Sequence, residues 1–259
     1  MIKKIILKTI NKLGWDLKKL NPKQKNFDFR DIHTKISKNH PIIFDVGGNS
    51  GQSIEAYLKH FNDPIIHSFE PVKTDFDLME LKFKDNKNIF LNNCALGDQT
   101  EEKEFNITAN TVNSSFNNIK SGEDWLKARS NELKVKNGPV VKDFKITTAQ
   151  KVNIIKLDDY VKDNNINHID LLKIDTQGYE DKILEGRLDT LRDNKVKAIM
   201  TEIMFDDIYD KYFSFSDIEK FILPYNFRMV GLRLPCNNLF SGPGFGCDVF
   251  YFNKNYHDI

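Results

Sequence analysis

The sequence has little cysteine: Cys94, Cys236 and Cys247 are its three cysteines, and none belongs to a CxxC pair. An odd number without metal-ligand spacing argues against a disulfide framework or a zinc site, so we expect reduced thiols in a cytoplasmic protein.

Long apolar runs are also missing. The basic start MIKKIILKTI is interrupted by Lys8, which does not fit a signal peptide, and no later run reaches the length of a membrane span.

A charge excess of either sign is absent too. The 38 Lys and Arg residues against 37 Asp and Glu give a formal net charge of +1. Nucleic-acid binding depends mainly on the neutralisation of phosphates, so we expect no nucleic-acid partner. A length of 259 residues with 40% hydrophobic residues fits a soluble protein of one or two domains.

Residues 1–40 are predicted to form a helical extension. Over residues 1–20 the Ile and Leu residues recur at helical spacing, opposite several lysines. This amphipathic helix is expected to pack on its own chain, on a second copy in a homo-oligomer, or peripherally on an anionic membrane surface.

From residue 41 onward, short apolar runs alternate with helical patterns, which is typical of βαβ units around a parallel sheet. Residues 106–150 interrupt this rhythm with an irregular, polar segment around Trp125. The predicted strands are 41–46, 64–69, 88–92, 152–156, 169–174 and 198–201, followed by a closing antiparallel pair, 227–231 and 247–252. The predicted helices are 52–60, 74–84, 157–164 and 180–186.

The first predicted strand ends in the glycine-rich sequence Asp45-Val-Gly-Gly-Asn-Ser-Gly51. Ligands of open parallel sheets bind beyond the carboxyl ends of the strands, where glycine lets the backbone approach closely. Glu70 ends the second strand, where a carboxylate can accept hydrogen bonds from both hydroxyls of a ribose. The dinucleotide fingerprint fails, because Asn49 and Gln52 stand where its later glycines belong. These features indicate a nucleoside cofactor and favour S-adenosylmethionine (SAM) over a nicotinamide.

Several motifs in order resemble the FkbM-type SAM-dependent methyltransferases. Phe44–Gly51 is similar to the first motif of that family, and Ile169–Glu180 contains its K-I-D-x-x-G-x-E signature. Between them stand FEP (69–71), CALGD (94–98), NSS (113–115) and the LDDY (157–160) of the segment 152–160.

The resemblance implies a class I methyltransferase fold, Rossmann-like α/β with a seven-stranded, mostly parallel sheet and a C-terminal antiparallel pair. It also implies O-methylation, often of a sugar or a secondary-metabolite hydroxyl. The domain is expected to span residues 41–259, with 106–150 as a lid over the acceptor. Two departures stand out: Gly48, where alanine is common, is expected to be harmless, whereas Gln177 replaces a common glutamate beside the cleft.

The cofactor is expected to lie along the ends of the first strands. Asp45 suits the ammonium of the methionine, and the loop amides of Gly47, Gly48, Asn49 and Gly51 suit its carboxylate. Glu70 is expected to hold the ribose and Asp175 to lie beside the cofactor. Adenine is placed near Asn93, Cys94, Ala95 and Leu96.

Three carboxylates are candidates for the chemistry. Asp175 and Glu202 end neighbouring strands, so we expect them to orient the acceptor hydroxyl and one of them to take its proton. Glu180 is a weaker candidate, because a carboxylate in a first helical turn stabilises the helix dipole. No spacing is diagnostic of a metal, and none is assigned. Ser114 and Ser115 are expected from the resemblance alone to contact the acceptor. The rings of Phe105, Phe116 and Trp125 are candidates to stack on a sugar face, but structural packing is the favoured role for any single one of them.

Three alternatives stay open from the sequence. A nicotinamide-dependent oxidoreductase fits the sheet and Glu70. A nucleic-acid methyltransferase is disfavoured, because Asp175 begins the sequence DTQG rather than the Asp/Asn-Pro-Pro-aromatic run of base methylases. A non-catalytic module with this fold would use the amphipathic N-terminus to bind a partner or a membrane.

Overall fold

A computed structural model describes residues 36, 39–119, 145–186, 188–204, 209–211, 213–233 and 246–256. The predicted N-terminal helix, the segment around Trp125 and Cys236 lie outside the described residues. The helical extension and the lid therefore stay predictions.

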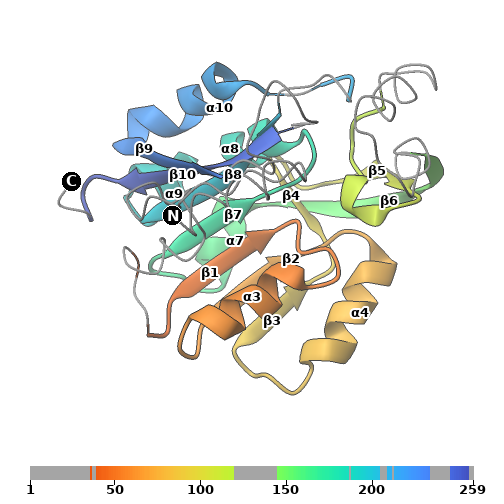
Figure 1. The fold of residues 1–259 in the computed structure, drawn as a ribbon, viewed down its shortest axis with the longest axis horizontal. Helices are drawn as coiled ribbons and strands as arrows, with labels where there is room; N and C mark the ends of the chain where they lie inside the picture. The colour runs from red at the N-terminus through yellow and green to blue at the C-terminus, as the bar shows by residue number, and fades with distance from the viewer. Residues whose placement is uncertain are drawn as a thin grey trace, which may run out of the picture.

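The centre of the fold is a seven-stranded sheet with the order β3-β2-β1-β7-β8-β10-β9 (Figure 1). Its first five strands are parallel, whereas β10 runs antiparallel to both β8 and β9. This arrangement confirms the predicted class I fold with its closing antiparallel pair. The strands are β1 (Ile42–Val46), β2 (Ile65–Phe69), β3 (Ile89–Asn92), β7 (Leu171–Ile174), β8 (Ala198–Met204), β9 (Phe227–Arg233) and β10 (Gly246–Asn253).

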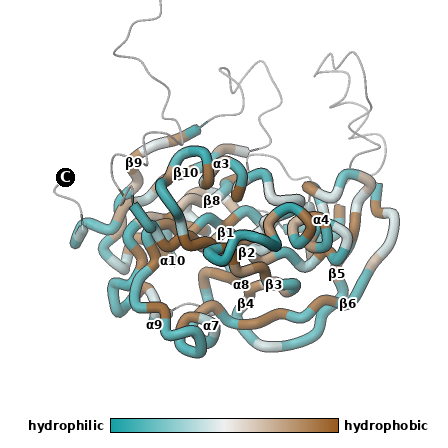
Figure 2. Tube along the Cα trace, turned by 90° about the horizontal axis from the view of Figure 1, so that it is seen from below, coloured by the Kyte–Doolittle hydropathy of each residue, from teal (hydrophilic) through white to brown (hydrophobic). Residues whose placement is uncertain are grey.

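Helices cover both faces of this sheet, and Figure 2 shows the apolar strands between them. One face packs on α3 and α4, and the other packs on α7, α8, α9 and α10. The helices are α3 (Gln52–His60), α4 (Lys73–Phe83), α7 (Leu157–Asp163), α8 (Glu180–Glu185), α9 (Leu188–Arg192) and α10 (Phe215–Ile222), with short 3-10 turns η1 (Thr111–Asn113) and η2 (Leu223–Tyr225).

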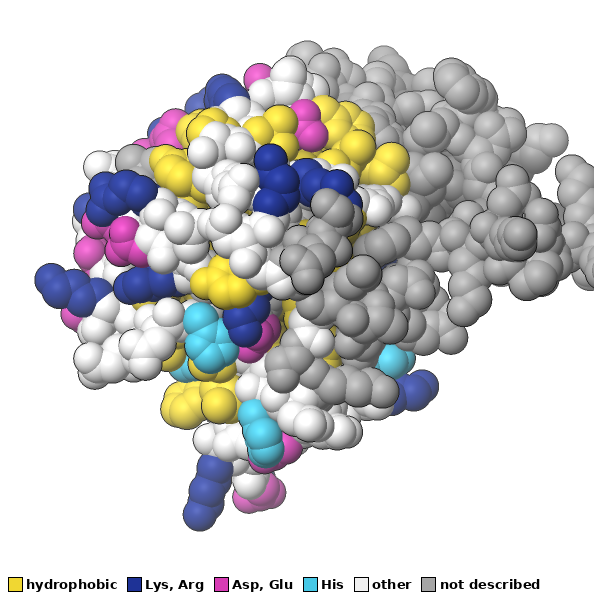
Figure 3. Space-filling model, turned by 90° about the vertical axis from the view of Figure 1, so that its left-hand side faces the viewer, with side chains coloured by type: hydrophobic (Ala, Val, Ile, Leu, Met, Phe, Trp, Pro, Cys, Tyr) yellow, Lys and Arg dark blue, Asp and Glu magenta, His cyan; other side chains and the backbone are white. Residues whose placement is uncertain are grey.

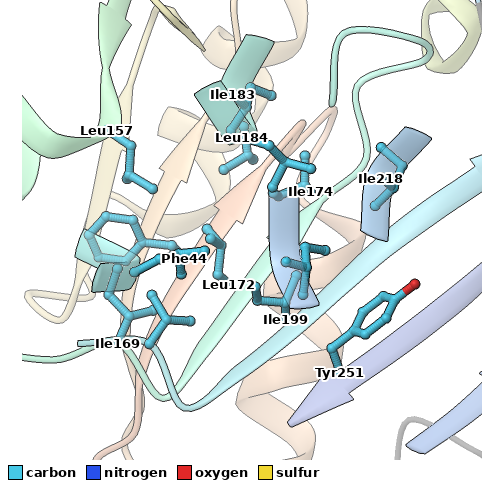
Figure 4. Close-up of a cluster of buried hydrophobic side chains, with 14 of the residues drawn as sticks. Phe44, Leu157, Ile169, Leu172, Ile174, Ile183, Leu184, Ile199, Ile218 and Tyr251 are labelled. Atoms are coloured by element: carbon cyan, nitrogen blue, oxygen red, sulfur yellow. The ribbon is translucent and has the colours of Figure 1, made fainter. Parts of the chain in front are cut away.

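The central strands are mostly apolar because both of their faces are buried. In β1, Phe44 and Val46 point into the cluster beneath α7, α8 and α10, whereas Ile43 points towards α3. Leu172 and Ile174 of β7 join Phe44 in the first cluster (Figure 4). The alternation places the polar residues of these strands, Asp45 and Lys173, on the α3 face.

A second, smaller sheet occupies part of the segment that the sequence predicts to be irregular. It has the order β4-β6-β5, with β4 (Ala95–Gly97), β5 (Glu101–Thr108) and β6 (Ile146–Lys156). β5 and β6 pair antiparallel and extend into both ends of the range 106–150. Their outer residues are mostly polar and exposed, and such strands are easily mistaken for loop in the sequence. The segment 152–156 thus belongs to this smaller sheet.

The described surface carries charges of both signs. On the face in Figure 3, basic and acidic side chains lie interspersed with apolar ones. Among the described residues, no helix combines the length and the hydropathy needed to cross a bilayer.

Candidate active site

A cavity of about 270 Å³ lies at the carboxyl ends of β1, β2 and β7. Its walls come from the glycine loop after β1, the residues after β2, the turn after β7 and the segment 111–116 that follows β5. The sheet order decides this location, because β1 has β2 on one side and β7 on the other, so the three carboxyl ends adjoin.

Gly47 and Gly48 line the cavity at the end of β1. Gly47 has a φ of +84°, and a Cβ at this position would lie 2.0 Å from the carbonyl oxygen of Asp175. The close approach of the two loops therefore requires glycine. At Gly48 a Cβ would lie 2.3 Å from Ser68 Oγ. The alanine that is common at this position in the family would therefore clash with Ser68, and glycine avoids the clash.

The amides of the glycine loop already have partners, contrary to the expected role on a methionine carboxylate. Gly47 and Gly48 each donate to the carbonyl oxygen of Phe69 at 3.1 Å, and Asn49 donates to Glu70 Oε2 at 2.8 Å. The first turn of α3 offers N–H groups instead: its cap, Gly51, has no side chain to satisfy them, and Gln52 and Ser53 line the cavity. Sequence reasoning missed this contribution, although the helix start was predicted.

Asp45 is fully buried and lies outside the cavity wall, so its assignment to the cofactor ammonium stays a prediction without a direct contact surface. Its partner is Lys173, the register neighbour on β7, whose Nζ lies 3.2 Å from Asp45 Oδ1. Lys173 Nζ also donates to the carbonyl oxygen of Gly47 at 3.0 Å and lies 3.5 Å from Asp175 Oδ2. Burial alone would lower the pKa of Lys173, but Asp45 and Asp175 outweigh it and raise the pKa above its ordinary value.

Glu70 lines the cavity as predicted and is 5% exposed. Its two oxygens accept the amides of Asn49, at 2.8 Å, and Val72, at 2.7 Å. These bonds fix the carboxylate while leaving lone pairs for further donors. Burial raises the pKa of Glu70 to about 7, although both amides oppose the shift.

The predicted adenine segment divides into two halves. Ala95 and Leu96 line the cavity, whereas Asn93 and Cys94 lie outside its wall. Asn93 Nδ2 instead donates to the carbonyl oxygens of Glu70 and Pro71, at 2.9 and 3.2 Å.

Two aromatic rings complete this side of the cavity. Phe105 and Phe116 pack edge to face, with centroids 4.8 Å apart, and both line the wall that includes Leu96. They pack on each other, and Phe116 also packs on Tyr179 with ring centroids 4.3 Å apart, as the favoured packing role predicts. Thr111 and Val112 also line the cavity. Both residues follow β5, a strand that the sequence analysis did not predict, and for this reason they were not among the predicted site residues.

The carboxylates of Asp175 and Glu202 share one donor. Gln177 Nε2 lies 3.1 Å from Asp175 Oδ1 and 2.8 Å from Glu202 Oε2, so the residue that replaces the family's glutamate bridges them. Asp175 lines the cavity, whereas Glu202 lies behind Gln177, outside the cavity wall. Burial, together with the charges of Asp175 and Glu180, raises the pKa of Glu202 well above its ordinary value. Its place outside the cavity wall, with Gln177 in front of it, fits a supporting role better than direct contact with an acceptor.

Glu180 holds the turn after β7. It is 3% exposed, and its carboxylate accepts the amide of Thr176 at 2.9 Å and that of Gly178 at 3.0 Å. Burial raises its pKa to about 7. The group lies outside the cavity wall, so the geometry fits turn bracing better than catalysis.

The two serines of the NSS motif also differ. Ser114 lines the cavity, and its Oγ accepts the amide of Thr108 at 3.1 Å. Ser115 is buried and donates to the carbonyl oxygen of Gln177 at 2.6 Å. Ser115 thus braces the turn after β7. Within the described part of the chain, no group of three or more His, Cys, Asp and Glu side chains is placed to hold a metal ion.

A sequence model of the methyltransferase FkbM domain matches residues 45–229, the stretch from the glycine loop to β9. The chain belongs to the FkbM methyltransferase family. This FkbM methyltransferase is an enzyme that uses SAM as its methyl donor, which decides against the nicotinamide alternative. The cavity fits such a donor, because a glycine-lined loop, the Glu70 carboxylate and an aromatic wall follow one another around it.

The solved structures similar to this FkbM methyltransferase are distant. An rRNA methylase from Streptococcus thermophilus is 12% identical, with 86% of this chain and 93% of that chain covered and a TM-score of 0.43. TrmK from M. capricolum, in complex with S-adenosylhomocysteine (SAH), is 10% identical, with coverages of 90% and 72% and a TM-score of 0.46. Fibrillarin from Aeropyrum pernix, with bound SAM, is 10% identical, with coverages of 84% and 68% and a TM-score of 0.43. A comparison with curated proteins found no match.

Gly48 and Ser68 are expected to be energetically coupled. Gly48→Ala places a Cβ 2.3 Å from Ser68 Oγ and should cost about 1–2 kcal/mol of unfolding free energy. Ser68→Ala loses a 3.3 Å hydrogen bond to Asp45 and should cost about 1 kcal/mol. We expect the double variant to lose less than the sum in urea denaturation, because the clash is gone. Strict additivity would show that the two side chains do not interfere.

Glu180→Gln is expected to destabilise the protein, because the new NH₂ group must face the amide of either Thr176 or Gly178. A loss of about 2 kcal/mol in the free energy of unfolding is expected. Glu185→Gln is the control on the same helix: it removes a partly exposed ion pair with Lys182 and should cost less than about 1 kcal/mol. Unchanged stability of Glu180→Gln with loss of turnover would instead assign this carboxylate to the chemistry.

Proposed function

We propose that the enzyme methylates a hydroxyl of a saccharide or similar small hydroxylated acceptor, in glycan or secondary-metabolite biosynthesis. The observation that carries the proposal is the placement of Asp175. Its carboxylate ends β7, lines the cofactor cavity and lies beside Lys173 and Gln177. A hydroxyl is a poor nucleophile until it loses its proton, so an accessible carboxylate at the transfer point suits such an acceptor.

The cofactor orientation follows from the walls of the cavity. We place the ribose hydroxyls on Glu70, the adenine between Leu96 and the rings of Phe105 and Phe116, and the methionine end along the glycine loop towards α3. This orientation directs the methyl group to Asp175. It uses the first turn of α3, at Gln52 and Ser53, to receive the methionine carboxylate.

In the proposed reaction, SAM supplies a methyl group activated by a sulfonium. The acceptor oxygen forms a bond to the methyl carbon while the electron pair of the C–S bond goes to sulfur. Asp175 takes the hydroxyl proton, and the products are the O-methyl acceptor and SAH. Most of the remaining catalysis is alignment of the two reactants, which the rigid ends of β1 and β7 provide.

Glu202 is assigned a supporting role. It lies outside the cavity wall, and Gln177 links it to Asp175. We propose that Glu202 and Gln177 hold the Asp175 carboxylate in position, while Asp175 alone accepts the proton.

Label transfer from SAM to a panel of sugars, sugar phosphates, nucleotide sugars and glycan fragments tests the function. Transfer confined to RNA or protein substrates would overturn it.

Asp175→Asn is expected to lower kcat by about 10²- to 10⁴-fold, because the amide cannot take a proton. The affinity for SAH, measured by calorimetry, should change by less than about threefold, since the shape of the wall is kept. Glu202→Gln serves as the matched variant: an isostere outside the cavity wall keeps a carbonyl oxygen for the hydrogen bond from Gln177 and should lower kcat by less than about tenfold. Equal losses in both variants would contradict the division of roles.

The affinity for SAH is expected to fall as the pH falls. Burial raises the pKa of Glu70 to about 7, so the carboxylate that accepts the ribose hydroxyls is protonated below that pH in the free protein. Between pH 8 and pH 6 the Kd should rise roughly tenfold. Glu70→Gln should bind SAH more weakly at pH 8 and show a flat profile. A slope that persists in this variant would place the titrating group elsewhere.

A further inference from the structure

A second cavity, of about 580 Å³, lies on the α3 face of the sheet. It is bordered by α3, β7, β8 and the end of β9. Four residues line both this cavity and the cofactor cavity, namely Gln52, Ser53, Lys173 and Asp175. A molecule in the second cavity therefore reaches the carboxylate proposed as the base.

The charged side chains of its wall are mostly basic. Lys59, Lys173 and Arg233 line it, and Asp175 is the carboxylate among its described wall residues. The acidic partners of two of these bases lie outside the wall: Asp45 pairs with Lys173, and Asp248 accepts Arg233 Nε at 2.6 Å. Lys173 Nζ also lies 3.5 Å from Asp175 Oδ2, and Asp175 is part of the wall, so the charge of Lys173 is balanced within the site.

Lys59, like Arg233, is exposed. It stands near the end of α3, and no ion pair between described residues includes it. Arg233, by contrast, is held in place by Asp248. A fixed guanidinium and an unengaged ammonium on one cavity form a favourable environment for a phosphate or a carboxylate.

Apolar surface accompanies the charges. Ala56, Tyr57 and Met200 also line the cavity, with Tyr57 and Met200 almost completely buried. Pockets for small polar molecules combine such surface with a few polar groups that fix the orientation. The C–H face of a sugar ring suits this wall, with its hydroxyls directed to Asp175.

We propose that the second cavity binds the methyl acceptor, and that this acceptor is a hydroxylated small molecule carrying a phosphate or carboxylate group. Lys59 and Arg233 hold the anionic group, and Asp175 receives the proton of the hydroxyl that is methylated. The inference rests on the proposed O-methyl transfer and adds to it the charge of the acceptor. The bonds formed and broken are those given above, with SAH as the second product.

Calorimetry on the full chain saturated with SAH tests the proposal. The probes are glucose 1-phosphate, UDP-glucose and glucuronate, with glucose as the neutral control. We expect at least one anionic probe to bind at least tenfold more tightly than glucose. The three anions separate a monophosphate, a diphosphate and a carboxylate as the recognised group.

Variants that reverse or remove the charge of a wall residue show where the anionic probe binds. Lys59→Glu should weaken the anionic probe at least tenfold and leave the Kd of SAH within twofold. Arg233→Gln should weaken the probe as well. Lys254→Glu is the matched control, because this exposed lysine in the turn after β10 lines neither cavity, and it should leave both affinities unchanged.

Three results would overturn the inference: no binding of any anionic probe, equal affinity for glucose, or equal weakening by Lys59→Glu and Lys254→Glu. A change in SAH affinity in Lys59→Glu as large as that for the probe would assign the cavity to the cofactor. Failure of the unmodified protein to bind SAH would instead contradict the proposed function itself, so the two failures are distinguishable.

Discussion

The buried ion pair between Asp45 and Lys173 holds the site together. One ammonium lies 3.2 Å from Asp45 and 3.5 Å from Asp175, and it donates to the carbonyl oxygen of Gly47. It therefore ties the end of β1, the glycine loop and the candidate base into one unit. A buried pair of this kind contributes little net stability compared with apolar residues of similar size, but loss of one partner leaves an uncompensated buried charge. We attribute the pair to positioning.

Several hydrogen bonds also fix the turn after β7. Glu180 accepts two of its amides, Ser115 donates to the carbonyl oxygen of Gln177, and Asn117 Nδ2 donates to that of Gly178. These contacts leave the carboxylate of Asp175 exposed between two cavities while its backbone is fixed. Rigid placement of a reacting group matters for a displacement reaction, whose rate depends on the alignment of donor and acceptor. The signature motif thus encodes a scaffold around one accessible carboxylate.

Much of the fold was predictable from the sequence, because the buried central strands are continuous apolar runs that end in glycine or a carboxylate. The segment Leu171–Ile174 is an example, whereas its place between β1 and β8 came from the structure. The strands β5 and β6 were not predictable in the same way: they are exposed on one side, and their polar residues read as loop. In the site, Glu70, Ala95, Leu96 and Asp175 line the cavity, whereas Asp45, Asn93 and Cys94 lie outside its wall, and the cofactor contacts assigned to all of them stay predictions.

The sequence by itself determined the family through its ordered motifs, and it predicted the buried strands and the glycine loop through apolar periodicity and local spacing. Tertiary structure alone decided which polar groups face the ligand. The amides of Gly47 and Gly48 are engaged by Phe69, which is distant in the sequence and adjacent in the sheet. Asp45 faces Lys173 because parallel pairing sets them in register. A polar residue at a strand end either meets a ligand or a neighbouring strand, and only the packing of the sheet decides between them.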